Sequence, residues 1–169
     1  MTDSAAHTPV WSLTWIRQHP LKFLGIVVHL LLRSLFGLFW LAAGINKISK
    51  DWLGSDVLQR IFLDRLGELP PDSFAVAYLQ NFAIPFYKPI AWLLTTGELY
   101  VAVGLLLGFT TRSAAAVSLF ILVNLALGGY YDASLIPFFV LNLIFLAWPS
   151  GQWLGLDRRR AQQHPARRH

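Results

Sequence analysis

Long apolar runs, each interrupted by a strongly polar side chain, dominate the pattern of this chain. The first run extends from Phe23 to Ile45 and ends at Asn46, Lys47 and Lys50. Three further runs cover residues 89–109, 113–129 and 133–148. About 20 apolar residues in a helix cross the hydrocarbon core of a bilayer. The pattern therefore predicts an all-α membrane protein built as a four-transmembrane-helix bundle.

The segments between and around these runs define the expected domain organisation. Residues 1–22 contain Trp11, Trp15, Arg17 and Lys22 and are typical of a segment lying on the membrane surface. Residues 23–149 form the membrane domain, with an external loop at 48–89, and residues 150–169 form a basic tail. We expect the first segment to be retained, because the apolar run after it is too long for a secretory signal.

The external loop carries two patterns of short amphipathic helices. Ser55 is placed to cap a helix whose apolar residues run from Val57 to Leu66 at helical spacing, and Gly67 ends it. After two prolines, Asp72 is placed to cap a second helix that reaches about Phe82. These helices fit a lid or docking surface at the mouth of the bundle, and equally a plain connector resting on the membrane.

The charges predict the orientation. Four spans place both termini on one side, where the basic residues are Arg17, Lys22, Arg112 and five arginines of the tail. On the other side, five basic residues are diluted by five acidic ones. The positive-inside rule then predicts a multi-pass protein of the inner (plasma) membrane with both termini cytoplasmic. This also explains the net charge of +5, so we expect no nucleic-acid partner.

Composition limits the available chemistry. The chain is 55% hydrophobic and 14% charged, which excludes an ordinary soluble domain. It has no cysteine, which excludes thiolate nucleophiles, iron–sulfur clusters and sulfur-ligated zinc. His29 is the one histidine within a predicted span, whereas a bis-histidine haem needs two. We therefore expect no metal and no intrinsic cofactor.

Each predicted span contributes a strongly polar residue at a similar expected depth. At 1.5 Å per residue, Arg33 and Glu98 both fall near the midplane, and Asn124 and Asn142 fall close to that level. Lys47 shares a helix face with Arg33, Gly37 and Gly44. One interpretation is a structural Arg33–Glu98 ion pair that fixes helix register. The other is a ligand cavity, for which Arg33, Lys47, Glu98, Asn124 and Asn142 are the candidate binding residues.

Several of these residues belong to longer runs that resemble a known family. LRSLFGLFWLAAGINKI, GELYVAVGLLLGFTTRSAA and GLDRR, in this order, resemble the DoxX and DoxD family of small bacterial and archaeal membrane proteins. The resemblance covers nearly the whole chain, from Leu31 to Arg159, and includes Arg33, Lys47, Glu98 and Arg112. It implies a four-helix membrane protein of the kind often assigned to thiosulfate:quinone oxidoreductase.

Two function classes follow from the resemblance and the polar layer. The first is a subunit of a quinone-linked oxidoreductase, which would bind a quinone or a small anion such as thiosulfate while a ligand or partner carries the electrons. The second is a non-catalytic accessory subunit of a larger membrane complex. Both classes imply the lipid bilayer and other membrane or peripheral subunits as partners. The residues themselves identify no catalytic group.

Overall fold

The computed structural model describes residues 12–148, and the regular elements in this range are all helical. The expected basic tail (150–169) and the first half of the expected surface segment (1–11) lie outside the described residues. The elements, in chain order, are α1 (Leu13–Gln18), α2 (Pro20–Ser49), α3 (Val57–Glu68), α4 (Phe74–Tyr78), the π-helical turn η1 (Leu79–Ala83), α5 (Tyr87–Leu107), α6 (Thr111–Leu127), the 3-10 turn η2 (Ala133–Leu135) and α7 (Ile136–Ala147).

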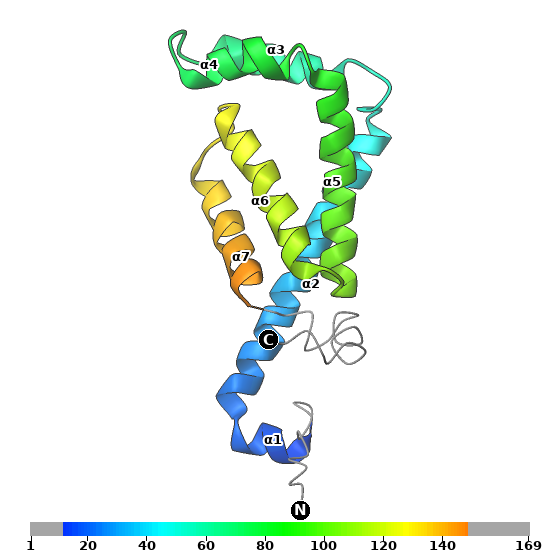
Figure 1. Ribbon diagram of the computed structural model, residues 1–169, viewed down its shortest axis with the longest axis vertical. Helices are drawn as coiled ribbons and strands as arrows, with labels where there is room; N and C mark the ends of the chain where they lie inside the picture. The colour runs from blue at the N-terminus through cyan, green and yellow to red at the C-terminus, as the bar shows by residue number, and fades with distance from the viewer. Residues whose placement is uncertain (1–11, 149–169) are drawn as a thin grey trace, which may run out of the picture.

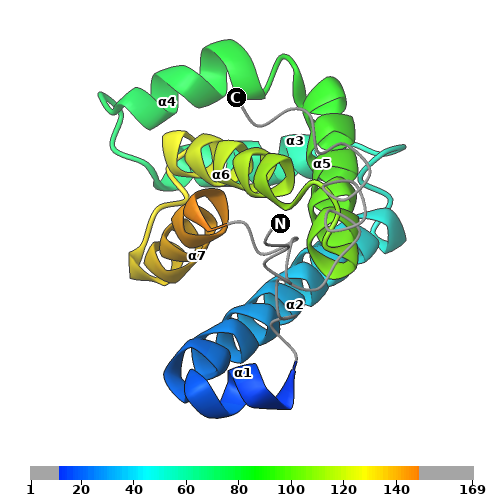
Figure 2. The ribbon, with the colours of Figure 1, turned by 60° about the horizontal axis from the view of Figure 1, so that its bottom comes forward.

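Four of the helices form the body of the molecule, and two short ones cover one end of it. In Figure 1, α2, α5, α6 and α7 run along the long axis, while α3 and α4 lie across the top. Helix α2 packs on α5, α5 on α6, and α6 on α7, so helices that follow one another along the chain are neighbours. Figure 2 shows the same order from nearer the lower end. The amphipathic loop segment is thus placed as a cap over the end of the bundle.

Some helices are longer or shorter than the transmembrane spans that the sequence predicts. Helix α2 has 30 residues and extends the expected first span at both ends, with Pro20 in its first turn. Helices α2 and α5 have the length and hydropathy needed to cross a membrane. Helices α6 and α7 are apolar but shorter, at 17 and 12 residues.

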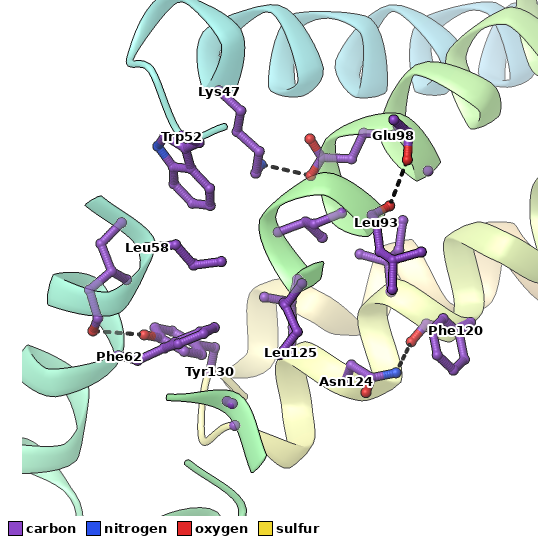
Figure 3. A pocket seen from close by; sticks show the side chains of 18 of the residues that line it. Lys47, Trp52, Leu58, Phe62, Leu93, Glu98, Phe120, Asn124, Leu125 and Tyr130 are labelled. Atoms are coloured by element: carbon purple, nitrogen blue, oxygen red, sulfur yellow. Dashed lines mark hydrogen bonds and ion pairs between the residues drawn. The ribbon is translucent and has the colours of Figure 1, made fainter. Parts of the chain in front are cut away.

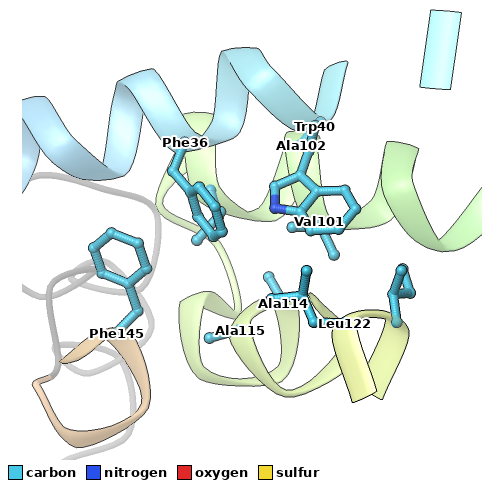
Figure 4. Packing of buried hydrophobic residues seen from close by; sticks show 10 residues of the cluster. Phe36, Trp40, Val101, Ala102, Ala114, Ala115, Leu122 and Phe145 are labelled. Atoms are coloured by element: carbon cyan, nitrogen blue, oxygen red, sulfur yellow. The ribbon is translucent and has the colours of Figure 1, made fainter. Parts of the chain in front are cut away.

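Small residues bring the helices together. A Cβ atom on Gly37 would lie 2.9 Å from Leu106 Cγ, and one on Gly44 would lie 2.8 Å from Leu99 Cδ2, so both glycines let α5 approach α2 closely. Gly104 has the same role at Ala114 of α6, where the corresponding distance is 2.8 Å. The core between these contacts is apolar and includes Phe36, Trp40, Val101 and Phe145 (Figure 4). These contacts fix which residues of α2 face which residues of α5.

Of the two helices predicted in the external loop, the first is confirmed and the second starts at a different cap residue. The expected helix at Val57–Leu66 is confirmed as α3, which continues past Gly67 to Glu68. The expected cap by Asp72 is wrong: Ser73 Oγ accepts a hydrogen bond from Val76 N at 3.3 Å and starts α4. The helix then widens into η1, which continues it to Ala83. Because a π turn adds one residue per turn, it rotates the side chains that follow it.

Candidate functional site

The last turn of α2 and the middle of α5 are joined by a buried ion pair. Lys47 Nζ lies 2.7 Å from Glu98 Oε1, and the two side chains are 13% and 5% exposed. Gly44 lies one turn before Lys47, and its missing side chain lets the Glu98 region of α5 come close. Lys47 Nζ also lies 4.8 Å from the centre of the Trp52 ring. The second carboxylate oxygen, Glu98 Oε2, is buried and has no hydrogen-bond partner among the described residues.

The expected pairing of Arg33 with Glu98 is wrong. Gly37 faces Leu105 and Leu106, and Gly44 faces Glu98 and Leu99, so α2 and α5 are antiparallel in a fixed register. Arg33 is eleven residues before Gly44, which places it about 16 Å along the helix from the level of Glu98. Arg33 is nevertheless buried, at 3% exposure, at the opposite end of the bundle from the cap. Lys47, rather than Arg33, is the cation that neutralises Glu98.

The two asparagines also lie at different levels. Asn124 of α6 accepts a hydrogen bond from Tyr78 OH at 2.9 Å, which ties α6 to the cap helix α4. Asn142 of α7 is fully buried and donates to Phe138 O at 2.8 Å. The rings of Phe138 and Phe145, on either side of Asn142, both pack on Phe36, only three residues from Arg33. The expected single polar layer is therefore two levels, with Lys47, Glu98 and Asn124 near the cap and Arg33 and Asn142 farther from it.

A cavity of about 620 Å³ lies at the level nearer the cap. It is enclosed by the end of α2, the cap elements α3, α4 and η1, and the facing sides of α5 and α6 (Figure 3). Most of its lining is apolar, and the charged residues among the lining are Lys47 and Glu98. Its lining includes Asn124 but neither Arg33 nor Asn142. Three of the five candidate residues, Lys47, Glu98 and Asn124, therefore line the same cavity.

Polar contacts, in addition to apolar packing, hold the cap over this cavity. Tyr130 OH donates to Ile61 O at 3.1 Å, which links α3 to the turn after α6. Arg65 of α3 donates to Gly129 O and lies over the Tyr130 ring, with Cζ 5.3 Å from the ring centre. Burial raises the pKa of Tyr130, and the nearby Arg65 guanidinium partly opposes that rise. The phenol therefore stays protonated and able to donate across the neutral pH range.

None of the seven aromatic residues that line the cavity was among the sequence-predicted candidates, and three of them have a polar atom and lie outside the long helices. Trp52 follows α2, Tyr78 ends α4 and Tyr130 lies in the turn after α6, and all three line the cavity. Trp52 also carries a buried Nε1 atom that has no hydrogen-bond partner among the described residues. The available signal was an indole or phenol in the external loop for Trp52 and Tyr78, and a phenol in the turn after the third apolar run for Tyr130. Nothing in the sequence shows that these three rings face the same cavity.

The part of the chain that the structure describes does not bring together three or more histidine, aspartate or glutamate side chains that could hold a metal ion. What the cavity offers is a paired ammonium and carboxylate at one end of an apolar chamber. Such a chamber suits a ligand with an apolar body and one or two polar atoms, because few polar groups fix the orientation of a ligand in an apolar pocket.

Comparison with known proteins identifies the family. Residues 28–130 match the DoxX family model, and this range contains α2 from its first third through α6. It includes Lys47, Glu98 and Asn124, whereas Asn142 lies beyond it. No curated protein and no solved structure matches the chain. The match covers more than half of the sequence, and the chain therefore belongs to the DoxX family of membrane proteins.

Proposed function

We propose that this chain is an integral membrane subunit of a quinone-linked oxidoreductase and that the cavity under the cap binds the quinone. The observation that carries the proposal is the buried Lys47–Glu98 pair at one end of an otherwise apolar cavity of about 620 Å³. This volume falls within the range of about 300–1,000 Å³ that is usual for small-molecule sites.

The charges of the cavity favour a neutral ligand over an anion. Lys47 and Glu98 carry opposite charges 2.7 Å apart, so the lining has no net charge. An anion such as thiosulfate would have to leave water for an apolar site without a free positive charge to compensate it, which is costly. A quinone ring is neutral and loses little on leaving the bilayer for this site. The quinone is therefore the ligand that we assign to this cavity.

The polar atoms of the pair match both redox states of a quinone. The Lys47 ammonium has three hydrogens, of which one is used by Glu98, so it can donate to a quinone carbonyl oxygen. Glu98 Oε2 can accept a hydrogen bond from a quinol hydroxyl, since it has no other partner among the described residues. Reduction of the quinone takes up two electrons and two protons. In this proposal Glu98 relays the two protons one after the other, and a partner subunit delivers both electrons from an anionic donor such as thiosulfate.

The proposal includes a four-span topology with both termini in the cytoplasm of a plasma membrane. Helices α2 and α5 are long enough alone, and α6 and α7 would complete the bundle with their flanking turns. Arg17 lies in the last turn of α1, Lys22 in the first turn of α2 and Arg112 in the first turn of α6. Figure 1 shows α1, the start of α2 and the turn between α5 and α6 away from the cap helices α3 and α4. A reporter fused after His169 should be cytoplasmic, and one inserted near Pro71 should be external. Both reporters on one side would contradict the topology.

The competing function is a non-catalytic accessory subunit of a larger membrane complex. Glycine faces are one feature by which such a subunit would bind partner helices. Gly37 and Gly44 are already occupied by α5, and Gly97 and Gly104 by α6, which weakens this alternative. The exposed leucines of α2, at positions 21, 24, 31, 32, 35 and 38, are equally suited to lipid.

The first experiment is purification from native membranes in a mild detergent, followed by solvent extraction and mass spectrometry. The proposal predicts a quinone in near-stoichiometric amount, and predicts its loss from the Lys47→Met variant. Leu38→Ala, on the exposed face of α2, serves as the control and should retain it. Stable co-purification of partner proteins with no quinone in the wild type would favour the accessory function.

A further inference from the structure

The cavity is closed at the charged end and open at the other. Lining residues on the side of the ion pair are buried, including the side chain of Glu98 at 5% exposure and Leu58, which lies beside Trp52 in Figure 3, at 2%. Lining residues at the opposite side are exposed, including Leu93 at 71% and Phe120 at 67%. In Figure 3, Leu93 and Phe120 lie on one side of the cavity, and Lys47 and Trp52 lie on the other. The cavity therefore has an opening between α5 and α6.

This opening faces the side of the bundle rather than its capped end. Leu93, Thr96 and Tyr100 line the opening and are exposed at helical spacing along α5. The same exposed stripe continues away from the cap through Val103 and Leu107, which are 50% and 54% exposed. A continuous apolar stripe on a long apolar helix is the surface expected to meet lipid. The opening thus leads to the hydrocarbon of the bilayer.

The opening arises because α5 and α6 separate toward the cap. They touch at the end away from the cap, where Gly104 meets Ala114 and Tyr100 OH lies 2.8 Å from Ser113 Oγ. Figure 1 shows the two helices diverging from that turn toward α3 and α4. Gly97 lines the cavity between the two helices, and α6 still contacts α5 at its level, because a Cβ atom there would lie 3.2 Å from Ile121 Cδ1 and 3.6 Å from Val117 Cγ1. A larger side chain at position 97 would have to displace the end of the Ile121 side chain or extend past it into the cavity.

We infer that the opening between α5 and α6 is a lateral portal through which the apolar tail of a membrane-dissolved, long-chain quinone leaves the cavity into the bilayer. The inference rests on the proposed quinone site and adds the class of ligand, which is a prenyl- or alkyl-tailed quinone. The ring lies near Lys47 and Glu98, and the tail passes Gly97 between Leu93 and Phe120. The ligand enters from the bilayer, since the cap covers the other approach.

A lateral portal makes a specific prediction about tail length. If the tail leaves through the portal, it lies in lipid both before and after the quinone binds. The tail then adds little to the affinity when the quinone concentration is expressed per lipid molecule. A tail enclosed by protein would instead have to fit the cavity, and long tails would be rejected. The portal therefore predicts that tail-less and ten-carbon-tailed benzoquinones bind the wild-type protein in nanodiscs within threefold of each other on the lipid concentration scale.

The blocking variant is Gly97→Leu, and its matched control is Gly25→Leu. Gly25 lies in α2 with no atom within 4 Å of a built Cβ, so the same substitution there fills no gap. Gly97→Leu should weaken binding of the tailed quinone tenfold or more and of the tail-less quinone less than threefold, while Gly25→Leu should change neither. Equal weakening of both quinones by Gly97→Leu would overturn the portal.

A second measurement uses the wild-type chain and does not depend on the folding of a variant. A quinone with a photoreactive diazirine at the end of its tail is irradiated in nanodiscs, and the labelled peptides are identified by mass spectrometry. The portal predicts labels within residues 93–100 and 117–124 that excess unlabelled quinone removes. Competed labels within α3 or α4, or failure of the tailed quinone to bind while the tail-less one does, would overturn the portal and leave the quinone site intact. Binding of neither quinone would overturn the proposed function itself.

Discussion

Replacing Lys47 with methionine while Glu98 remains tests the ion pair directly. At 2.7 Å and an effective dielectric constant of 20, the gross attraction between the two charges is about 6 kcal/mol. Removing both charges from water costs several kcal/mol for each ion, so the intact pair contributes little net stability. Removing one partner leaves the other charge buried, which costs about 3–5 kcal/mol. The double variant Lys47→Met/Glu98→Leu should be nearly neutral.

The two single variants should lower the free energy of unfolding by different amounts. Glu98 is 5% exposed and its Oε2 atom has no other described partner, so Lys47→Met should fall at the upper end of that range. Lys47 is 13% exposed, ends a helix and has a flexible side chain, so after Glu98→Leu its ammonium can extend toward water. The loss of stability caused by Glu98→Leu should therefore fall at the lower end of the range of about 3–5 kcal/mol.

The measurement is reversible unfolding in mixed micelles of increasing sodium dodecyl sulfate, followed by far-ultraviolet circular dichroism. The double-variant cycle should give a coupling free energy of at least about 3 kcal/mol between the two sites. The control is a second double-mutant cycle, in which Arg33→Met is combined with Glu98→Leu. Because Arg33 and Glu98 lie at different levels of the bundle, this cycle should give a coupling free energy below about 0.5 kcal/mol. Additive effects of Lys47→Met and Glu98→Leu would refute the pairing.

Further predictions test the helix contact, the cap and the ligand charge. Gly44→Ile should destabilise the protein by about 1–3 kcal/mol because its Cβ would meet Leu99 at 2.8 Å, while Gly25→Ile, which meets nothing within 4 Å, should not; equal effects in the same unfolding assay would contradict the close contact. Because burial raises the pKa of Tyr130, the folded protein keeps this proton where the unfolded chain releases it, so stability should fall as the pH rises above about 10. Tyr130→Phe should show a smaller fall in unfolding experiments at pH 9–11, and an unchanged fall would contradict the buried phenol. Thiosulfate at 10 mM should leave the affinity for a quinone unchanged in a titration, because the cavity lining carries no net charge; competitive displacement would show that an anion binds there.

Helix content and helix packing were accessible from the sequence, because they follow from local pattern. The apolar runs predicted α2 and α5, and the helical spacing showed that Gly37 and Gly44 share one face of α2, which is the face that α5 packs on. The loop helix α3 followed from the spacing between Val57 and Leu66. In each case the signal and the structure it specifies lie within a few turns of one helix.

The ion pair was not accessible, because it depends on the register between two helices. Counting residues from the expected span ends placed Arg33 and Glu98 at one depth. In the structure α2 begins at Pro20 and ends at Ser49, and contacts at Gly37 and Gly44 set the level of Glu98 beside Lys47. A shift of about ten residues in a helix changes depth by about 15 Å, which is half the hydrocarbon core.

The lining of the cavity was accessible only in part. Lys47, Glu98 and Asn124 stood out as polar residues in or beside apolar runs, and the structure brings them to one cavity. Tyr78 and Trp52 depend on how the loop folds back over the bundle, which no local pattern specifies. The π turn η1 adds to this difficulty because it changes the direction of the side chains after Tyr78.

The most direct test of the quinone site is an equilibrium titration of the tailed benzoquinone with three forms of the protein in nanodiscs. Lys47→Met removes the proposed donor to the carbonyl, whereas Asn142→Leu alters a buried polar residue outside the cavity. We predict saturable one-to-one binding by the wild type, at least tenfold weaker binding by Lys47→Met, and less than twofold change for Asn142→Leu. No saturable binding by the wild type, or equal affinities for all three folded proteins, would contradict the assignment of this cavity to a quinone.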